Sequence, residues 1–138
     1  MKDQGFRLRT GRVGFFILSV LFAASVLAQV YIAGAATFVN PTNWAKHIEF
    51  VHLFGFTIPL LMLIFAFIGR LPRRSLIQVM GVMLTIFLMY FTANITRTLP
   101  WAGALHPVIA VVIAGQSIVI VTNAWNLIRK NKREELTK

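Results

Sequence analysis

Residues 47–68 read HIEFVHLFGFTIPLLMLIFAFI, an apolar stretch that decides the fold. Its length is close to the ~20 residues that a helix needs to cross the hydrocarbon core of a membrane. Similar stretches occupy about residues 13–39, 76–95 and 108–128. The connections are short and contain proline, glycine and asparagine, so neighbouring helices are expected to run antiparallel. We predict an all-α, integral membrane, up-down four-helix bundle that forms one domain over residues 1–138.

The composition supports a membrane protein and excludes several kinds of chemistry. Hydrophobic residues make up 57% of the chain and charged residues 13%, whereas soluble domains are ~45–50% apolar. The chain has no cysteine, which excludes thiolate metal sites, disulfides and covalent c-type haem attachment. The formal net charge of +10 comes from residues beside the apolar stretches, where lipid headgroups explain it. We therefore expect contact with a lipid bilayer and no nucleic-acid partner.

The distribution of basic residues predicts the orientation in the membrane. Only Lys46 and Arg97 fall on one side of the predicted bundle. The other side holds Lys2, Arg7, Arg9, Arg12, Arg70, Arg73, Arg74, Arg129, Lys130, Lys132, Arg133 and Lys138. Because cytoplasmic loops carry the excess of lysine and arginine, the positive-inside rule predicts a multi-pass protein of the cytoplasmic membrane with both termini cytoplasmic.

The first apolar stretch also has features of a secretory signal peptide. A basic segment precedes it, and Val26-Leu27-Ala28 would serve as a cleavage site. The apolar character continues past Gln29, beyond the ~7–15 residues of a signal-peptide core. We expect this stretch to be retained as the first span.

The candidate functional residues are the histidines. The chain has three, His47, His52 and His106, and one carboxylate away from its ends, Glu49. The predicted topology places all four near the outer face, with His52 ~12 Å inward from the interfacial Trp44. Imidazoles held at one depth in an apolar bundle are the usual protein contribution to a metal or haem site.

Helix phase separates two of these histidines. Five residues at ~100° each put His47 and His52 ~140° apart around a helix, so both cannot face one narrow seam. We expect His52 to face inward, because it shares a face with Gly55 and Pro59. Glu49 is expected to hydrogen-bond the His52 imidazole from one turn away. His47 is expected at the level of the lipid headgroups.

These expectations lead to a first hypothesis, an outer-leaflet cofactor site that holds a b-type haem. His52 and His106 would ligate the iron, and Glu49 or Gln29 would orient one imidazole. Pro107, as the first residue of the fourth helix, would hold His106 at that helix end. The function would be electron transfer with a quinol or another redox partner.

Two other functions remain open at this stage. One is a non-enzymatic membrane subunit or accessory protein, acting in a homo-oligomer or a membrane complex. The other is divalent metal or proton handling by His47, His52, His106 and Glu49, because three imidazoles and a carboxylate suit zinc or copper. The sequence does not decide whether the protein is an enzyme.

The order of several short segments resembles a family of small bacterial four-span membrane proteins of unassigned function. These segments are residues 29–34 (QVYIAG), Trp44 with His47, residues 50–55 (FVHLFG), residues 69–74 (GRLPRR) and residues 105–107 (LHP). The resemblance covers nearly the whole chain and implies a compact membrane bundle, without an activity. A looser, architectural likeness is to membrane b-type cytochromes and to one half of haem A synthase. Unlike two-haem electron relays, this chain lacks a pair of histidines on both membrane faces.

Overall fold

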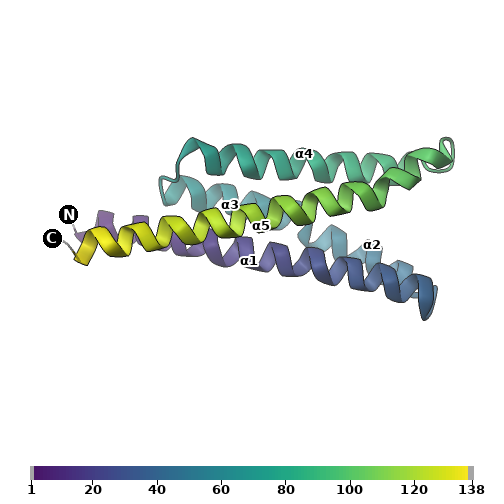
Figure 1. Ribbon diagram of the computed structural model, residues 1–138, viewed down its shortest axis with the longest axis horizontal. Helices are drawn as coiled ribbons and strands as arrows, with labels where there is room; N and C mark the ends of the chain where they lie inside the picture. Colours follow the sequence, from purple (N-terminus) through teal and green to yellow (C-terminus); the bar gives the residue numbers. More distant parts are fainter. Residues whose placement is uncertain (1, 137–138) are drawn as a thin grey trace.

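The computed structural model describes residues 2–136, and it describes side chains for residues 5–130. Within this part the chain is all helical (Figure 1): α1 (Lys2–Phe38), α2 (Asn43–Phe54), α3 (Thr57–Ile68), α4 (Arg73–Ile95) and α5 (Pro100–Leu136). With α2 and α3 counted as one unit, 4 helical units are long and apolar enough to cross a membrane. This confirms the predicted all-α, four-span architecture. Of the basic residues used for the orientation, Lys2, Lys132, Arg133 and Lys138 lie outside the described side chains.

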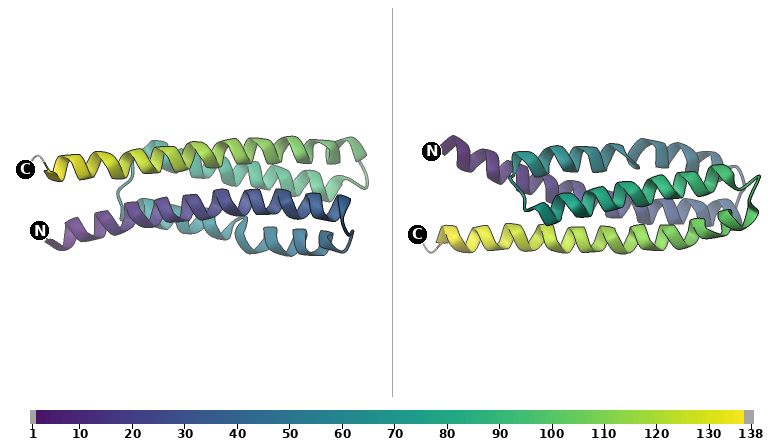
Figure 2. Two further views of the ribbon diagram at one scale, coloured as in Figure 1. Left: turned by 60° about the horizontal axis from the view of Figure 1, so that its bottom comes forward. Right: turned by 90° about the horizontal axis from the view of Figure 1, so that it is seen from above.

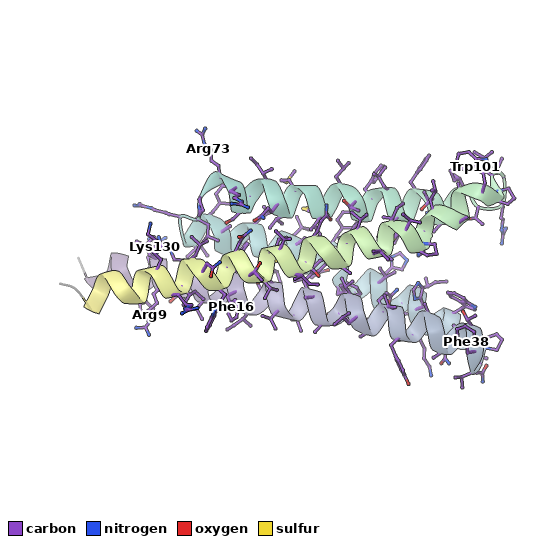
Figure 3. The ribbon with its side chains drawn as sticks, viewed as in Figure 1. Arg9, Phe16, Phe38, Arg73, Trp101 and Lys130 are labelled. Atoms are coloured by element: carbon purple, nitrogen blue, oxygen red, sulfur yellow. The ribbon has the colours of Figure 1, made fainter. Side chains whose placement is uncertain are left out.

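The helices run up and down between two distinct ends. Both described ends of the chain lie beside the α3–α4 turn, and the α1–α2 and α4–α5 turns lie at the opposite end (Figure 2). Arg9, Arg73 and Lys130 lie at or near the first end, which we call the basic end (Figure 3). Phe38 and Trp101 lie at the other, which we call the tryptophan end.

Near the basic end, the backbones of α1 and α3 touch. A Cβ atom on Gly11 would overlap the backbone of Gly69 and lie 2.8 Å from the carbonyl carbon of Ile68. Arg12 Nε donates a hydrogen bond of 3.2 Å to the Gly69 carbonyl oxygen. Small residues allow this close packing, which replaces the hydrophobic effect as a source of helix association in lipid. The basic half of the bundle is therefore tightly joined.

The second span is broken in the middle, where α2 ends and α3 begins. Pro59 lacks an N–H group to bond the Gly55 carbonyl, and its ring crowds that carbonyl. The apolar stretch predicted as one helix therefore forms two. Beyond the break α2 packs against α1, and among the described residues no Cα atom of α2 lies within 8 Å of α4 or α5. The bundle is consequently open on one side toward the tryptophan end.

The start of α5 differs from the prediction. The helix begins at Pro100, and Pro107 lies inside it. Pro100 takes the first helical position, where a missing N–H costs nothing. A proline within a membrane helix is tolerated because neighbouring groups satisfy the freed backbone. His106 is therefore in the second turn of α5 rather than in front of the helix.

Candidate functional site

A cavity of about 300 Å³ lies at the side where α2 diverges from α4. It is bordered by Gln29, His47, Ile48, Val51, His52, Met89, Tyr90, Ala93, Asn94 and His106. All three histidines of the chain thus border one cavity, whose size is at the lower end of the ~300–1,000 Å³ typical of small-molecule sites. Because Ile48, His52 and Asn94 are exposed, the cavity opens at the outer surface of the bundle.

His47 and His106 approach each other across this cavity from the second turns of α2 and α5. Their ring centroids are 6.3 Å apart, and the ring planes are inclined by 57°. Both residues are half-buried. The Nδ1 atom of each ring is buried, and no hydrogen-bond partner for it is found among the described residues. This leaves Nε2 of each ring as the nitrogen available to a ligand.

Gln29 connects α1 to this histidine pair. Its side chain is only 6% exposed, and its Nε2 atom donates a hydrogen bond of 2.7 Å to the His47 carbonyl oxygen. Its Oε1 atom is buried, and the described residues offer it no donor. An amide oxygen can accept two hydrogen bonds. Gln29 thus fixes the position of His47 and presents a free acceptor beside the cavity.

His52 interacts with a residue that the sequence analysis missed, Tyr90 of α4. The two rings stack with centroids 5.4 Å apart. Tyr90 Oη donates a hydrogen bond of 3.1 Å to the Val51 carbonyl and lies 3.5 Å from His52 Nδ1. The position of Tyr90, five residues before α4 ends at Ile95, was the available indication, since a tyrosine hydroxyl inside a span needs a partner.

The structure changes the expected pairing of the histidines. The ring that approaches His106 is that of His47, whereas His52 is exposed and stacks on Tyr90. His47 is on the packed face of α2 because Phe54, seven residues later and nearly in phase with it, is buried. The prediction that His52 faces inward relied on residues beyond Phe54. Because the helix breaks there, those residues do not indicate which side of α2 is packed.

Within the described side chains, the residues predicted for a metal site with three or more ligands are not brought close enough together to hold one ion. Glu49 is exposed, does not border the cavity and makes no hydrogen bond to His52 within residues 5–130. Over the same residues, no three histidine or carboxylate side chains are grouped closely enough to hold a metal ion. The reason is that His47 and His52 lie on different faces of α2, and Glu49 lies outside the cavity.

The fold and the site define a class, a four-span membrane protein with a histidine-lined cavity at one end. Residues 29–98 match the family of unknown function DUF6220, and the chain belongs to this family. No curated protein and no solved structure is detectably similar. The matched region includes Gln29, His47, His52 and Tyr90, whereas His106 lies beyond it.

Proposed function

We propose that this protein is a membrane electron-transfer protein whose cavity would bind a b-type haem, with His47 and His106 as the residues that would hold the iron. The observation that carries the proposal is the 6.3 Å between their ring centroids. Two imidazoles on opposite sides of one metal ion, with metal–nitrogen bonds of ~2 Å, have ring centres about 6 Å apart. The two rings therefore have the separation that an iron ion between them requires.

The surroundings of the two imidazoles fit this role. When Nε2 of a histidine binds iron, its Nδ1–H group needs an acceptor, which orients the ring. Gln29 Oε1 is a buried acceptor without a donor, and it is the candidate partner for Nδ1 of His47, which is buried and has no acceptor among the described residues. Val51 and Met89 add apolar walls. Because the cavity opens toward lipid, a macrocycle wider than the cavity extends through the opening.

The absorption spectrum of the purified protein tests this proposal. The chain is expressed in a host supplied with a haem precursor, purified in detergent and examined before and after reduction with dithionite. We expect a Soret band, sharp visible bands of six-coordinate ferrous haem, and haem in equimolar amount to the chain. A protein without a Soret band overturns the proposal. Co-purification of a partner subunit, or a divalent ion found by metal analysis, would then support the other functions.

We also propose that the protein lies in the cytoplasmic membrane with both termini in the cytoplasm. This orientation is supported by Arg7 and Arg9 in the first part of α1, Arg73 and Arg74 at the start of α4 and Lys130 in the last part of α5. The haem would then lie in the outer half of the membrane. Electrons would be exchanged at the outer side.

Cysteine labelling tests the orientation without interference, because the chain has no cysteine of its own. In intact cells of the host, Thr98→Cys in the α4–α5 turn should react with a membrane-impermeant maleimide. Pro72→Cys in the α3–α4 turn should react only after the cells are opened. Both positions are exposed, so burial does not explain a difference. The reverse labelling pattern would contradict the proposed orientation.

A further inference from the structure

We infer that His52 and Tyr90 form a second binding site on the same cavity, which receives a hydroxyl group of a membrane-soluble hydroquinone, or quinol. The inference rests on the proposed haem site, which supplies the acceptor for the electrons of the quinol. It assigns different tasks to the histidines. His47 and His106 hold the cofactor, and His52 contacts the substrate.

The hydrogen bonds of Tyr90 determine what His52 can accept. A tyrosine has a single O–H hydrogen, and Tyr90 donates it to the Val51 carbonyl over 3.1 Å. Toward His52 Nδ1, 3.5 Å away, the Tyr90 oxygen can therefore act only as an acceptor. This assigns the hydrogen of the neutral imidazole to Nδ1 and the free lone pair to Nε2. His52 thus presents an acceptor that suits a quinol hydroxyl and does not suit a quinone carbonyl.

The location of His52 indicates a ligand that arrives through the lipid. The residue is exposed on a membrane-spanning helix and borders the cavity opening. Nothing among the described side chains bonds its Nε2 atom, and polar groups facing hydrocarbon are costly unless they have a partner or a function. A quinol, which dissolves in the membrane, reaches this surface directly.

The aromatic rings around His52 suit a flat substrate. The Tyr90 ring stacks on His52, with an interplanar angle of 28°. It also stacks on Phe56, with centroids 5.9 Å apart and an angle of 13°. Aromatic pairs favour such offset stacking at 4.5–7 Å. Tyr90 and His52 both border the cavity, so a flat quinol ring that enters it meets aromatic surface beside His52.

Oxidation of one quinol at this site would release two electrons, which two ferric haems would accept. One O–H bond of the quinol breaks, its proton passes to His52 Nε2 and its electron reduces one ferric iron to ferrous, leaving a neutral radical. After His52 has released the first proton to water at the tryptophan end, the second O–H bond breaks in the same way. The second electron reduces a second ferric haem protein. One quinol thus becomes one quinone, with two protons released and two haems reduced.

Rapid mixing of the ferric protein with a short-chain quinol tests the inference. Haem reduction is followed by absorbance. His52→Ala should slow reduction on the order of 100-fold, as expected for loss of a general base, and Tyr90→Phe should slow it several-fold. Haem content, midpoint potential and reduction by dithionite should stay unchanged in both variants. Glu49→Gln is the matched control, because Glu49 is one turn from His52 outside the cavity, and it should react at the wild-type rate.

The possible outcomes separate this inference from the proposed haem site. Suppose that the wild-type protein binds haem and that quinol reduces it at the same rate as His52→Ala and Tyr90→Phe. This result overturns the inference and leaves the proposed haem site intact. Loss of haem in His52→Ala would make His52 an iron ligand and would also overturn it. Wild-type protein without haem overturns both.

Discussion

His47→Ala and His106→Ala are each expected to abolish stable haem binding, whereas His52→Ala keeps the full Soret band. Each of the first two changes removes one of the two proposed iron ligands, and loss of even an outer partner of a ligand typically costs about 10–100-fold in affinity. Haem per chain should therefore fall at least about tenfold after purification. The measurement is the ratio of Soret absorbance to protein concentration for the three variants prepared side by side.

His52→Ala is a matched control for this experiment, because it removes the same kind of side chain from the same cavity and, compared with His47→Ala, from the same helix. Circular dichroism should show equal helix content in all three variants, so that loss of haem is not a consequence of unfolding. Added imidazole should restore part of the Soret band in His106→Gly, where it can occupy the vacated space. Loss of haem in His52→Ala with retention in His47→Ala would favour the pair His52 and His106 that the sequence alone suggested.

Among glycine-to-alanine substitutions far from the cavity, Gly11→Ala should destabilise the bundle the most. The new Cβ atom would overlap the backbone of Gly69, so relief requires α1 and α3 to separate. Overpacking typically costs 1–3 kcal/mol, and a clash with backbone places the expected loss at about 3 kcal/mol. Unfolding in mixed micelles of increasing dodecyl sulfate content, followed by tryptophan fluorescence, measures the loss.

The chain offers two controls for Gly11→Ala. A Cβ atom on Gly34 or on Gly115 meets nothing within 4 Å, and both glycines lie inside long helices. Alanine at either position should leave stability unchanged or raise it by up to ~1 kcal/mol, because alanine is the better helix former. Equal stability of Gly11→Ala and Gly34→Ala would contradict the close α1–α3 contact.

Most of the fold follows from hydrophobic length and turn residues, which is why the four spans could be predicted from the sequence. The division of the second span could also have been predicted. Pro59 was considered only as a small apolar position, although a proline disturbs the carbonyl four residues before it, here that of Gly55. The start of the last helix was ambiguous, because Pro100 and Pro107 both suit a first helical position. In the structure the helix begins at the first of the two.

The sequence predicted how deep in the bundle the histidines of the candidate site lie, but not which way their side chains point. Counting residues from the span ends correctly placed the histidines near one end of the bundle. The rotation of each helix about its axis depends on its packing partners, which the sequence does not specify. For α2 the spacing of His47, Phe50 and Phe54 at i, i+3 and i+7 was the better guide to the packed face. Tyr90 could be connected to His52 only once α4 was placed beside α2.

The divergence of α2 has a consequence for how this family can vary. Close glycine packing between α1 and α3 maintains the bundle at the basic end. At the other end the backbone of α2 packs against α1, and α2 meets α4 and α5 through side chains such as Tyr90 and His106. Substitutions along the free side of α2 therefore change what the cavity accepts without disturbing the contacts that assemble the membrane domain. Relatives can acquire different ligands while the packing of the bundle is unchanged, and a designer can alter the site by exchanging the exposed positions among residues 47–54.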